Sequence, residues 1–196
     1  MKYLPWKSVI SENSNPQGSV LGQRLQTDKF PLVRCNSMNK YLYKIIFIAI
    51  MSLEGKTYLI SPQKWPGWYI YMVNNSHANV RGWSSDPGPQ GYWTLEKIGL
   101  NLYRAVPKEW SNWYMYMQSN NDGNVRGWQG DPGHQGHWYV EQKGTVIIEG
   151  EHIPTYTFRP KAYPGWYMYM RDNSEGNVRG WNGDPDTAGY FIFTEL

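Results

Sequence analysis

The sequence WPGWYIYMVNNSHANVRGW, residues 65–83, decides the fold because close copies of it occur twice more along the chain. The second copy, WSNWYMYMQSNNDGNVRGW, spans residues 110–128, and the third, YPGWYMYMRDNSEGNVRGW, spans residues 163–181. The offsets are 45 and then 53 residues, and an Asp-Pro pair follows each copy at the same distance. The chain therefore contains three tandem repeats. We call them repeat A (56–100), repeat B (101–153) and repeat C (154–196), with the eight additional residues near 146–153 in the connection from B to C.

Within each repeat, the residue pattern alternates as in a half-buried β-sheet. In repeat A, Trp68, Ile70 and Met72 fall on one face of a strand, and Tyr69 and Tyr71 fall on the other. Clusters of Gly, Pro, Asn and Asp separate such stretches, which indicates tight turns. The strands that we expect in repeat A, with equivalents in B and C, lie near 57–61, 67–73, 79–83 and 91–97.

The predicted core requires all three repeats. A lone four-stranded sheet would leave its apolar face in water, whereas three repeats around an axis bury these faces together. Twelve short strands in three similar units predict an all-β, three-fold β-trefoil over residues 56–196. The inward-facing side chains expected in repeat A are Tyr58, Ile60, Trp68, Ile70, Met72, Val80, Trp93 and Leu95.

Residues 1–55 differ from the repeats in composition. They hold seven Lys or Arg against three Asp or Glu, whereas residues 56–196 hold twelve against thirteen. We expect residues 1–55 to be a poorly structured N-terminal tail. Two alternatives stay open: a weak signal-like segment ending in the apolar run IIFIAIM at 45–51, and a non-native extension if translation begins at Met51. That run is too short for a membrane span. A cytoplasmic location and secretion without a clear signal peptide both stay open.

The third and fourth predicted strands of repeat A resemble those of the ricin-B-type β-trefoil lectins. The resemblance is carried by NVRGW at 79–83 and PQGYWTL at 89–95. In that family the third strand ends in tryptophan and the fourth carries Gln-x-Trp. Here the glutamine and tryptophan are one residue further apart, and repeat C has Ala188 and Phe191 instead. The family's second-strand aspartate is not recognisable. The resemblance implies a β-trefoil, a lectin function and a sugar platform at the third-strand tryptophan.

A second resemblance gives an alternative fold. The stretch MQSNNDGNV at 117–125 is similar to the Gln-x-Asp-x-Asn-x-Val-x-Tyr signature of the bulb-type mannose lectins, which form a three-fold β-prism. The spacing differs from that signature, and the units of those lectins are shorter. The β-prism is therefore the second choice.

The third predicted strand carries the candidate binding residues. If Val80 faces the core, then Arg81 and Trp83 face solvent together. An exposed indole beside a guanidinium suits a carbohydrate, because sugar CH groups pack on the ring while charged donors reach the hydroxyls. An aspartate and an asparagine nearby add hydrogen-bonding groups. The candidate ligand-binding residues are Asn79, Arg81, Trp83, Asp86, Asn124, Arg126, Trp128, Asp131, Asn177, Arg179, Trp181 and Asp184.

Each feature also has a structural interpretation. Arg81 could stack on Trp83 as a cation–π pair within the fold, and Asp86 could simply begin a turn. The Tyr69 and Tyr71 positions are more typical of cross-strand packing than of a groove, and Met72 is typical of a core. The acidic loops 120–123 and 172–176 could bind calcium, but turn formation is the preferred explanation, because the equivalent loop 74–78 has no carboxylate.

The motifs that would indicate other functions are missing from the sequence. No His/Cys spacing suits zinc, no Gly-rich loop suits phosphate, and no Ser-His-Asp set stands out. The repeats are not basic, so nucleic acid is not expected as a partner. A site repeated three times suits multivalent binding better than catalysis.

We therefore predict a lectin-like module that binds glycans or glycoproteins at up to three equivalent weak sites, without enzymatic activity, cofactor or metal. The alternative is a protein-interaction trefoil, such as a cytoskeletal or protease-binding scaffold, that binds no sugar. A toxin that uses the trefoil for targeting would need a second domain.

Overall fold

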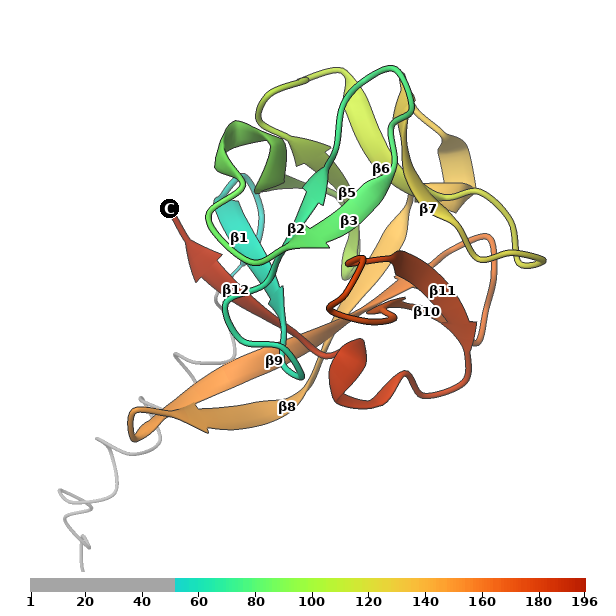
Figure 1. Cartoon of the computed structure of the whole chain (residues 1–196). Coiled ribbons are helices and arrows are strands. Elements are labelled where there is room, and N and C mark those ends of the chain that lie inside the picture. Colours follow the sequence, from blue (N-terminus) through green and yellow to red (C-terminus); the bar gives the residue numbers. More distant parts are fainter. Residues whose placement is uncertain (1–51) are drawn as a thin grey trace, which may run out of the picture. The chain divides into compact units, whose positions relative to one another are not determined.

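The computed structural model describes residues 52–196, which form an all-β domain (Figure 1). The predicted tail lies almost entirely outside the described residues, and its nature stays a prediction. Three short 3-10 helices, η1 (Gly88–Gly91), η2 (Gly133–Gln135) and η3 (Asp186–Ala188), occupy equivalent places in the repeats. The strands are β1 (Thr57–Pro62), β2 (Tyr69–Met72), β3 (Val80–Trp83), β4 (Tyr92–Gly99), β5 (Leu102–Pro107), β6 (Trp113–Met117), β7 (Val125–Gln129), β8 (Trp138–Ile148), β9 (Glu151–Pro160), β10 (Trp166–Met170), β11 (Val178–Asn182) and β12 (Phe191–Glu195).

The strand topology confirms the β-trefoil. Six strands close an antiparallel barrel in the order β1-β12-β9-β8-β5-β4. The other six pair as three hairpins, β2–β3, β6–β7 and β10–β11, one from each repeat. A single closed barrel with three hairpins is not the arrangement of a β-prism, so the alternative fold is wrong.

The core contains the side chains that alternation predicted. Of the eight inward-facing residues expected in repeat A, seven are buried, and Trp68 is partly buried against them. The fourth-strand aromatics Trp93, Trp138 and Phe191 have no exposed surface. The indole of Trp93 donates a hydrogen bond to the carbonyl of Ile70 (2.7 Å), and that of Trp138 donates one to the carbonyl of Met115 (2.8 Å). These bonds satisfy the only polar atom of each buried indole.

The three hairpins hold one another through a ring of methionine and glycine residues. The Met72 sulfur of repeat A occupies the space where a side chain at Gly127 of repeat B would lie. Met117 and Gly180 make the same contact from B to C, and Met170 and Gly82 make it from C to A. We call these three contacts the inter-repeat ring. Because each methionine sulfur fills the place of a Cβ atom, the third residue of each Val-Arg-Gly-Trp segment must be glycine for this contact to form.

Backbone hydrogen bonds reinforce the inter-repeat ring in the same order. Gly127 N–H donates to the carbonyl of Ala78 at 2.6 Å, where Ala78 lies at the tip of the repeat A hairpin. The equivalent bonds are Gly180 N–H to Gly123 (2.6 Å) and Gly82 N–H to Gly176 (2.7 Å). Each repeat is therefore joined to the next by a packed side chain and a main-chain bond.

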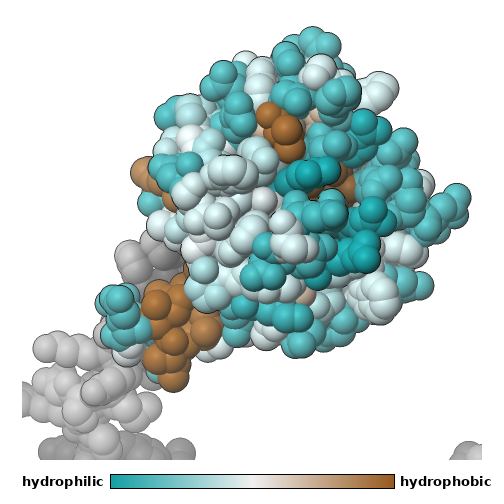
Figure 2. Space-filling model, in the orientation of Figure 1, coloured by the Kyte–Doolittle hydropathy of each residue, from teal (hydrophilic) through white to brown (hydrophobic). Residues whose placement is uncertain are grey.

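The additional residues of repeat B lengthen one hairpin of the barrel. Strands β8 and β9 continue to pair through Val146–Ile153, Ile147–His152 and Ile148–Glu151. This is the region to which the repeat offsets assigned the insertion. Ile147 is 65% exposed at the end of this hairpin, and Figure 2 shows an apolar patch there.

Candidate functional site

The third strand of each repeat, which is β3, β7 or β11, presents its tryptophan to solvent. Trp83, Trp128 and Trp181 are 51%, 54% and 52% exposed. The valines three residues earlier are buried, so the strands alternate as expected. The exposed indoles have the orientation that the binding hypothesis requires, and whether they bind a ligand stays a prediction.

Each exposed indole packs against a tyrosine, not an arginine. The Tyr71 and Trp83 rings are edge-to-face, with centroids 6.1 Å apart. Tyr116–Trp128 and Tyr169–Trp181 repeat this geometry at 6.0 and 6.1 Å. In residues 52–196 the cation–π contacts involve Trp65 and four tyrosines, but none of these indoles. The internal Arg–Trp pair is therefore not the arrangement of these side chains.

The structure divides the twelve predicted residues between two places. The tryptophan and aspartate of repeat A meet at a pocket beside the β2–β3 hairpin. The asparagines of all three repeats, with Arg81 and Arg179, line a different pocket where the three hairpins meet. The predicted set of Asn, Arg, Trp and Asp does not form one site.

The pocket beside Trp83 and Asp86, which we call the repeat A pocket, has a volume of about 320 Å³. It combines two aromatic rings with a carboxylate and an amide. Tyr71 in β2 supplies a ring, and Val73, directly after β2, supplies methyl groups. Strand β3 supplies the Trp83 indole. The segment that leads through η1 supplies the carboxylate and the amide. The lining residues are Tyr71, Val73, Trp83, Asp86, Pro87 and Gln90.

Asp86 also stabilises the turn that carries it. One carboxylate oxygen accepts the Gly88 N–H at 2.8 Å, and the other accepts the Tyr92 hydroxyl at 2.9 Å. The turn interpretation of the Asp-Pro pair is thus confirmed. A carboxylate offers about four acceptor positions, so Asp86 keeps capacity for a ligand hydroxyl. Its hydrogen bond to the Tyr92 hydroxyl raises the pKa of that tyrosine.

The equivalent aspartates in repeats B and C are bound to cationic side chains. Asp131 accepts from Gly133 N–H (2.8 Å) and lies 3.0 Å from the ring of His137 and 3.3 Å from Arg104. Desolvation raises the pKa of Asp131, but the bonds from Gly133 and His137 outweigh it and lower the pKa overall. The three positions are therefore chemically inequivalent.

In repeat C, the Tyr190 hydroxyl donates to Asp184 at 2.8 Å, and the Lys143 ammonium lies 3.0 Å from its other oxygen. The bond from Tyr190 is the main cause of the lowered pKa of Asp184, followed by the bond from Lys143.

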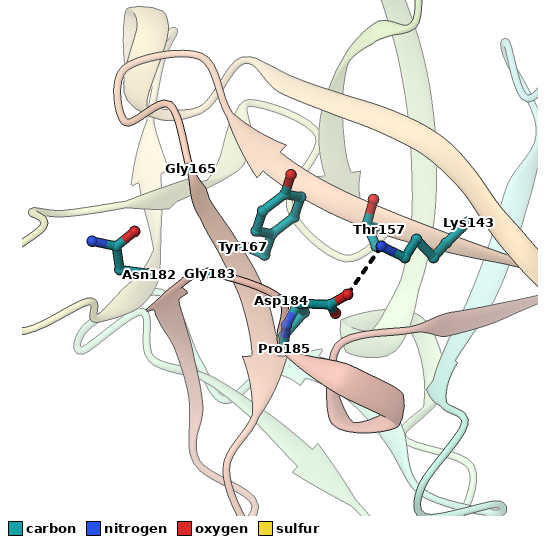
Figure 3. Close-up of a pocket in the computed structure, with 8 residues that line it drawn as sticks. All are labelled: Lys143, Thr157, Gly165, Tyr167, Asn182, Gly183, Asp184 and Pro185. Carbon is teal, nitrogen blue, oxygen red and sulfur yellow. Dashed lines mark hydrogen bonds and ion pairs between the residues drawn. The ribbon is translucent and has the colours of Figure 1, made fainter.

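A pocket of about 320 Å³ lies beside Asp184, but it is not the counterpart of the repeat A pocket. Its walls include Tyr167 and not the exposed Trp181, and strands β8 and β9 supply two of its residues. Figure 3 shows the Asp184 carboxylate directed at Lys143 across this space. The lining residues are Lys143, Thr157, Gly165, Tyr167, Asn182, Gly183, Asp184 and Pro185.

Sequence reasoning did not assign four residues of the repeat A pocket, namely Tyr71, Val73, Pro87 and Gln90. Tyr71 was expected to pack across the hairpin, and it does so while also lining the pocket. Tyr71 pairs with Arg81 in the register of the hairpin, which places it diagonally to Trp83. The diagonal position of Tyr71 relative to Trp83 on the neighbouring strand is the feature that could have assigned Tyr71 to the pocket. Gln90 belongs to the stretch that resembles the ricin-B-type fourth strand.

The acidic loops serve as turns. Asp122 accepts the Ser119 hydroxyl (2.7 Å), and Asp172 accepts the N–H of Glu175 (2.8 Å). These bonds are the main causes that lower the pKa of each aspartate. Within residues 52–196, no group of three His, Cys, Asp or Glu side chains is placed to hold a metal ion. The same residues contain no helix with the length and apolarity for a membrane crossing.

Acid should destabilise the domain through these aspartates. Asp122, Asp131, Asp172 and Asp184 all have folded-state pKa values below 3.8, the ordinary value of an aspartate. Their contribution to stability is complete above the unfolded-state pKa and is lost as pH falls through the folded-state pKa. We expect the melting temperature, followed by circular dichroism, to stay level from about pH 7 to pH 5 and to fall below about pH 4. Asp184→Asn should make this fall smaller, and a melting temperature that stays constant down to about pH 2 would contradict the expectation.

Comparison with known proteins supports the fold and relates a part of the chain to toxins. No family model matches the chain. Over 49 residues, 25% of this chain, the sequence is 35% identical to Toxin CaTX-A of Carybdea alata and 37% identical to Toxin CfTX-B of Chironex fleckeri. The match spans 11% of each toxin.

Solved structures similar to this chain include β-trefoils. The designed three-fold symmetric protein ThreeFoil has a TM-score of 0.59 at 18% identity, over 71% of this chain and 99% of that one. The Macrolepiota procera ricin B-like lectin in complex with lactose has a TM-score of 0.58 at 15% identity, over 73% and 97%. A mosquitocidal holotoxin has a TM-score of 0.63 at 13% identity, over 73% of this chain and 17% of that one. At these identities, the comparisons establish the fold.

Proposed function

We propose that this protein is a carbohydrate-binding module and that the repeat A pocket is its principal glycan site. The observation that carries the proposal is the exposed Trp83 indole beside Asp86 in a pocket of about 320 Å³. A sugar can stack its CH groups on the indole while its hydroxyls reach the Asp86 carboxylate and the Gln90 amide. The volume is at the lower end of those that hold small ligands.

The other two tryptophans provide weaker sites in this proposal. Trp128 and Trp181 are as exposed as Trp83, so the apolar platform is present in every repeat. Their aspartates are already bound to Arg104 and His137 in repeat B and to Lys143 in repeat C. A sugar hydroxyl must compete with these side chains for the carboxylate oxygens. We therefore expect the affinity of the repeat A site to exceed that of the other two.

The pocket favours binding over catalysis. Glycoside hydrolysis generally uses two carboxyl groups on opposite sides of the scissile bond. Asp86 is the only carboxylate among the lining residues of the repeat A pocket, and it also holds its own turn. We accordingly propose a module without enzymatic activity.

Removing the indole of repeat A should abolish most glycan binding. We expect Trp83→Ala to weaken binding by about tenfold or more, because the sugar loses its stacking surface. The measurement is a glycan array screen followed by titration calorimetry, with lactose as the first probe. Trp181→Ala is the matched control and should change the affinity by less. Absence of binding to every glycan on the array would overturn the proposal, as would binding that the Trp83→Ala, Trp128→Ala, Trp181→Ala triple variant retains.

The similarity to toxins favours a compatible second candidate, a targeting module. The trefoil corresponds to 17% of the holotoxin chain, so this fold occurs as one part of a longer toxin. In this role the glycan site would attach the protein to cell surfaces. Binding to cultured cells that free sugar cannot displace, together with capture of one specific protein, would instead favour a protein-interaction trefoil.

A further inference from the structure

The pocket where the three hairpins meet lies on the three-fold axis, separate from the repeat A pocket. Isolated backbone bridges join Asn79 to Arg126, Asn124 to Arg179 and Asn177 to Arg81. These bridges connect A to B, B to C and C to A, so one Asn-Val-Arg segment from each repeat surrounds the axis. The cavity that they enclose, which we call the axial pocket, has a volume of about 160 Å³. Its lining residues are Asn79, Val80, Arg81, Asn124, Val125, Asn177, Val178 and Arg179.

The arginine of each Asn-Val-Arg segment has no carboxylate partner within residues 52–196, and two of these arginines, Arg81 and Arg179, line the axial pocket. Arg104 and Arg159 of the barrel each lie within 3.4 Å of a glutamate or aspartate oxygen. Arg81, Arg126 and Arg179 have no such oxygen within 4.0 Å among the described residues. Arg126 donates to the carbonyl of His77 at 2.7 Å, a bond that leaves its positive charge uncompensated.

Carboxylates occur at the hairpin tips but not in the lining of the axial pocket. Asp122 accepts the amide of Asn124 at 2.7 Å, and Glu175 accepts that of Asn177 at 2.6 Å. Repeat A has His77 at the corresponding position. The lining of the axial pocket itself holds two arginines, Arg81 and Arg179, and no carboxylate, so the lining has a positive charge balance.

We propose that the axial pocket binds one tetrahedral oxyanion, a sulfate or a phosphate, either free or as an ester. Guanidinium groups donate paired hydrogen bonds that match the oxygens of such anions. A tetrahedral anion on the axis can direct one oxygen toward each repeat. Its fourth oxygen then lies on the axis and points toward solvent, where the rest of an ester would continue. The proposal does not depend on the glycan site.

The direct test is titration calorimetry of the full chain with sodium sulfate and with sodium phosphate, at constant ionic strength. We expect one anion per chain, because the three repeats share a single axis. The Arg81→Gln, Arg179→Gln double variant should weaken binding by about tenfold or more through loss of the charge-assisted bonds. Arg171→Gln is the matched control, since Arg171 is exposed and does not line the pocket, and it should bind like the unchanged protein.

Further measurements separate the sources of the anion and the two proposed sites. Galactose 6-sulfate that binds more tightly than both galactose and inorganic sulfate would identify a sulfated glycan as the ligand, whereas equal affinity for the two sulfates would identify the free anion. The triple tryptophan variant should bind sulfate unchanged, which distinguishes this site from the glycan site. No binding of either inorganic anion, or equal binding by the double arginine variant, would overturn the proposal.

Discussion

Trp138→Ala should lower the free energy of unfolding by about 3–5 kcal/mol, because it empties the centre of the core. The Trp138 side chain has no exposed surface, and its ring packs edge-to-face on Phe158 at 6.0 Å. Alanine at this position also removes the hydrogen bond to the carbonyl of Met115, which is buried at the middle of β6. The measurement is chemical denaturation followed by circular dichroism, with the midpoint and slope fitted for both proteins.

Repeat C provides the control for this substitution. Phe191 occupies the equivalent position and is fully buried, so the fold accepts a phenylalanine there. Trp138→Phe should therefore lower the free energy of unfolding by only about 1–2 kcal/mol, from the lost hydrogen bond and a small cavity. A smaller loss for alanine than for phenylalanine would show that Trp138 is not the packing centre that the structure indicates.

Gly127→Val should destabilise the domain by about 1–3 kcal/mol through overpacking of the inter-repeat ring. A side chain here would overlap the sulfur of Met72 and lie 3.4 Å from the ring of Trp113. Valine has a higher β-strand propensity than glycine, so without this overlap the substitution in β7 would stabilise the strand. A decrease in the free energy of unfolding would therefore show that the overlap with Met72 exists, and an increase would show that it does not. Thermal and chemical denaturation both measure this change.

A strand glycine with open space serves as the comparison. At Gly144, the nearest atom to an added methyl group would be the Thr155 hydroxyl oxygen at 3.8 Å. Gly144→Val should thus be neutral or slightly stabilising. Met72→Ala combined with Gly127→Val should be less destabilising than the sum of the two single changes, because the shorter side chain vacates the space. Strict additivity in this double-mutant cycle would mean that the two residues do not interact.

The sequence predicted the fold because its repeats and its alternation agree. The offsets set the number of units, and period two separated buried Val80 from exposed Trp83 without knowledge of the tertiary structure. The same rule identified the core of repeat A, and the unequal offset located the lengthened β8–β9 hairpin. The number of repeats and the place of the insertion follow from the offsets, and the burial pattern follows from the geometry of a single strand. Neither depends on contacts between strands.

The composition of the candidate site depends on contacts between strands and repeats, which alternation does not contain. Arg81 and Trp83 share a face of β3, yet the first lies at the meeting point of the hairpins and the second lies at the periphery. The cation beside Asp131 comes from β5, and the cation beside Asp184 comes from β8. Three similar repeats therefore acquire three different environments from residues that are not themselves repeated.

The one-way order of the inter-repeat ring has a consequence for how the protein is made. The contact from Met170 to Gly82 joins the last repeat to the first, so the ring cannot close on a ribosome until repeat C has left the exit tunnel. Until then, the glycine of repeat A lacks the side chain that fills it, and the tip of the repeat B hairpin lacks its main-chain partner. Nascent repeats A and B would expose apolar surface to which chaperones can bind. Completion of the chain would bury this surface in one cooperative step.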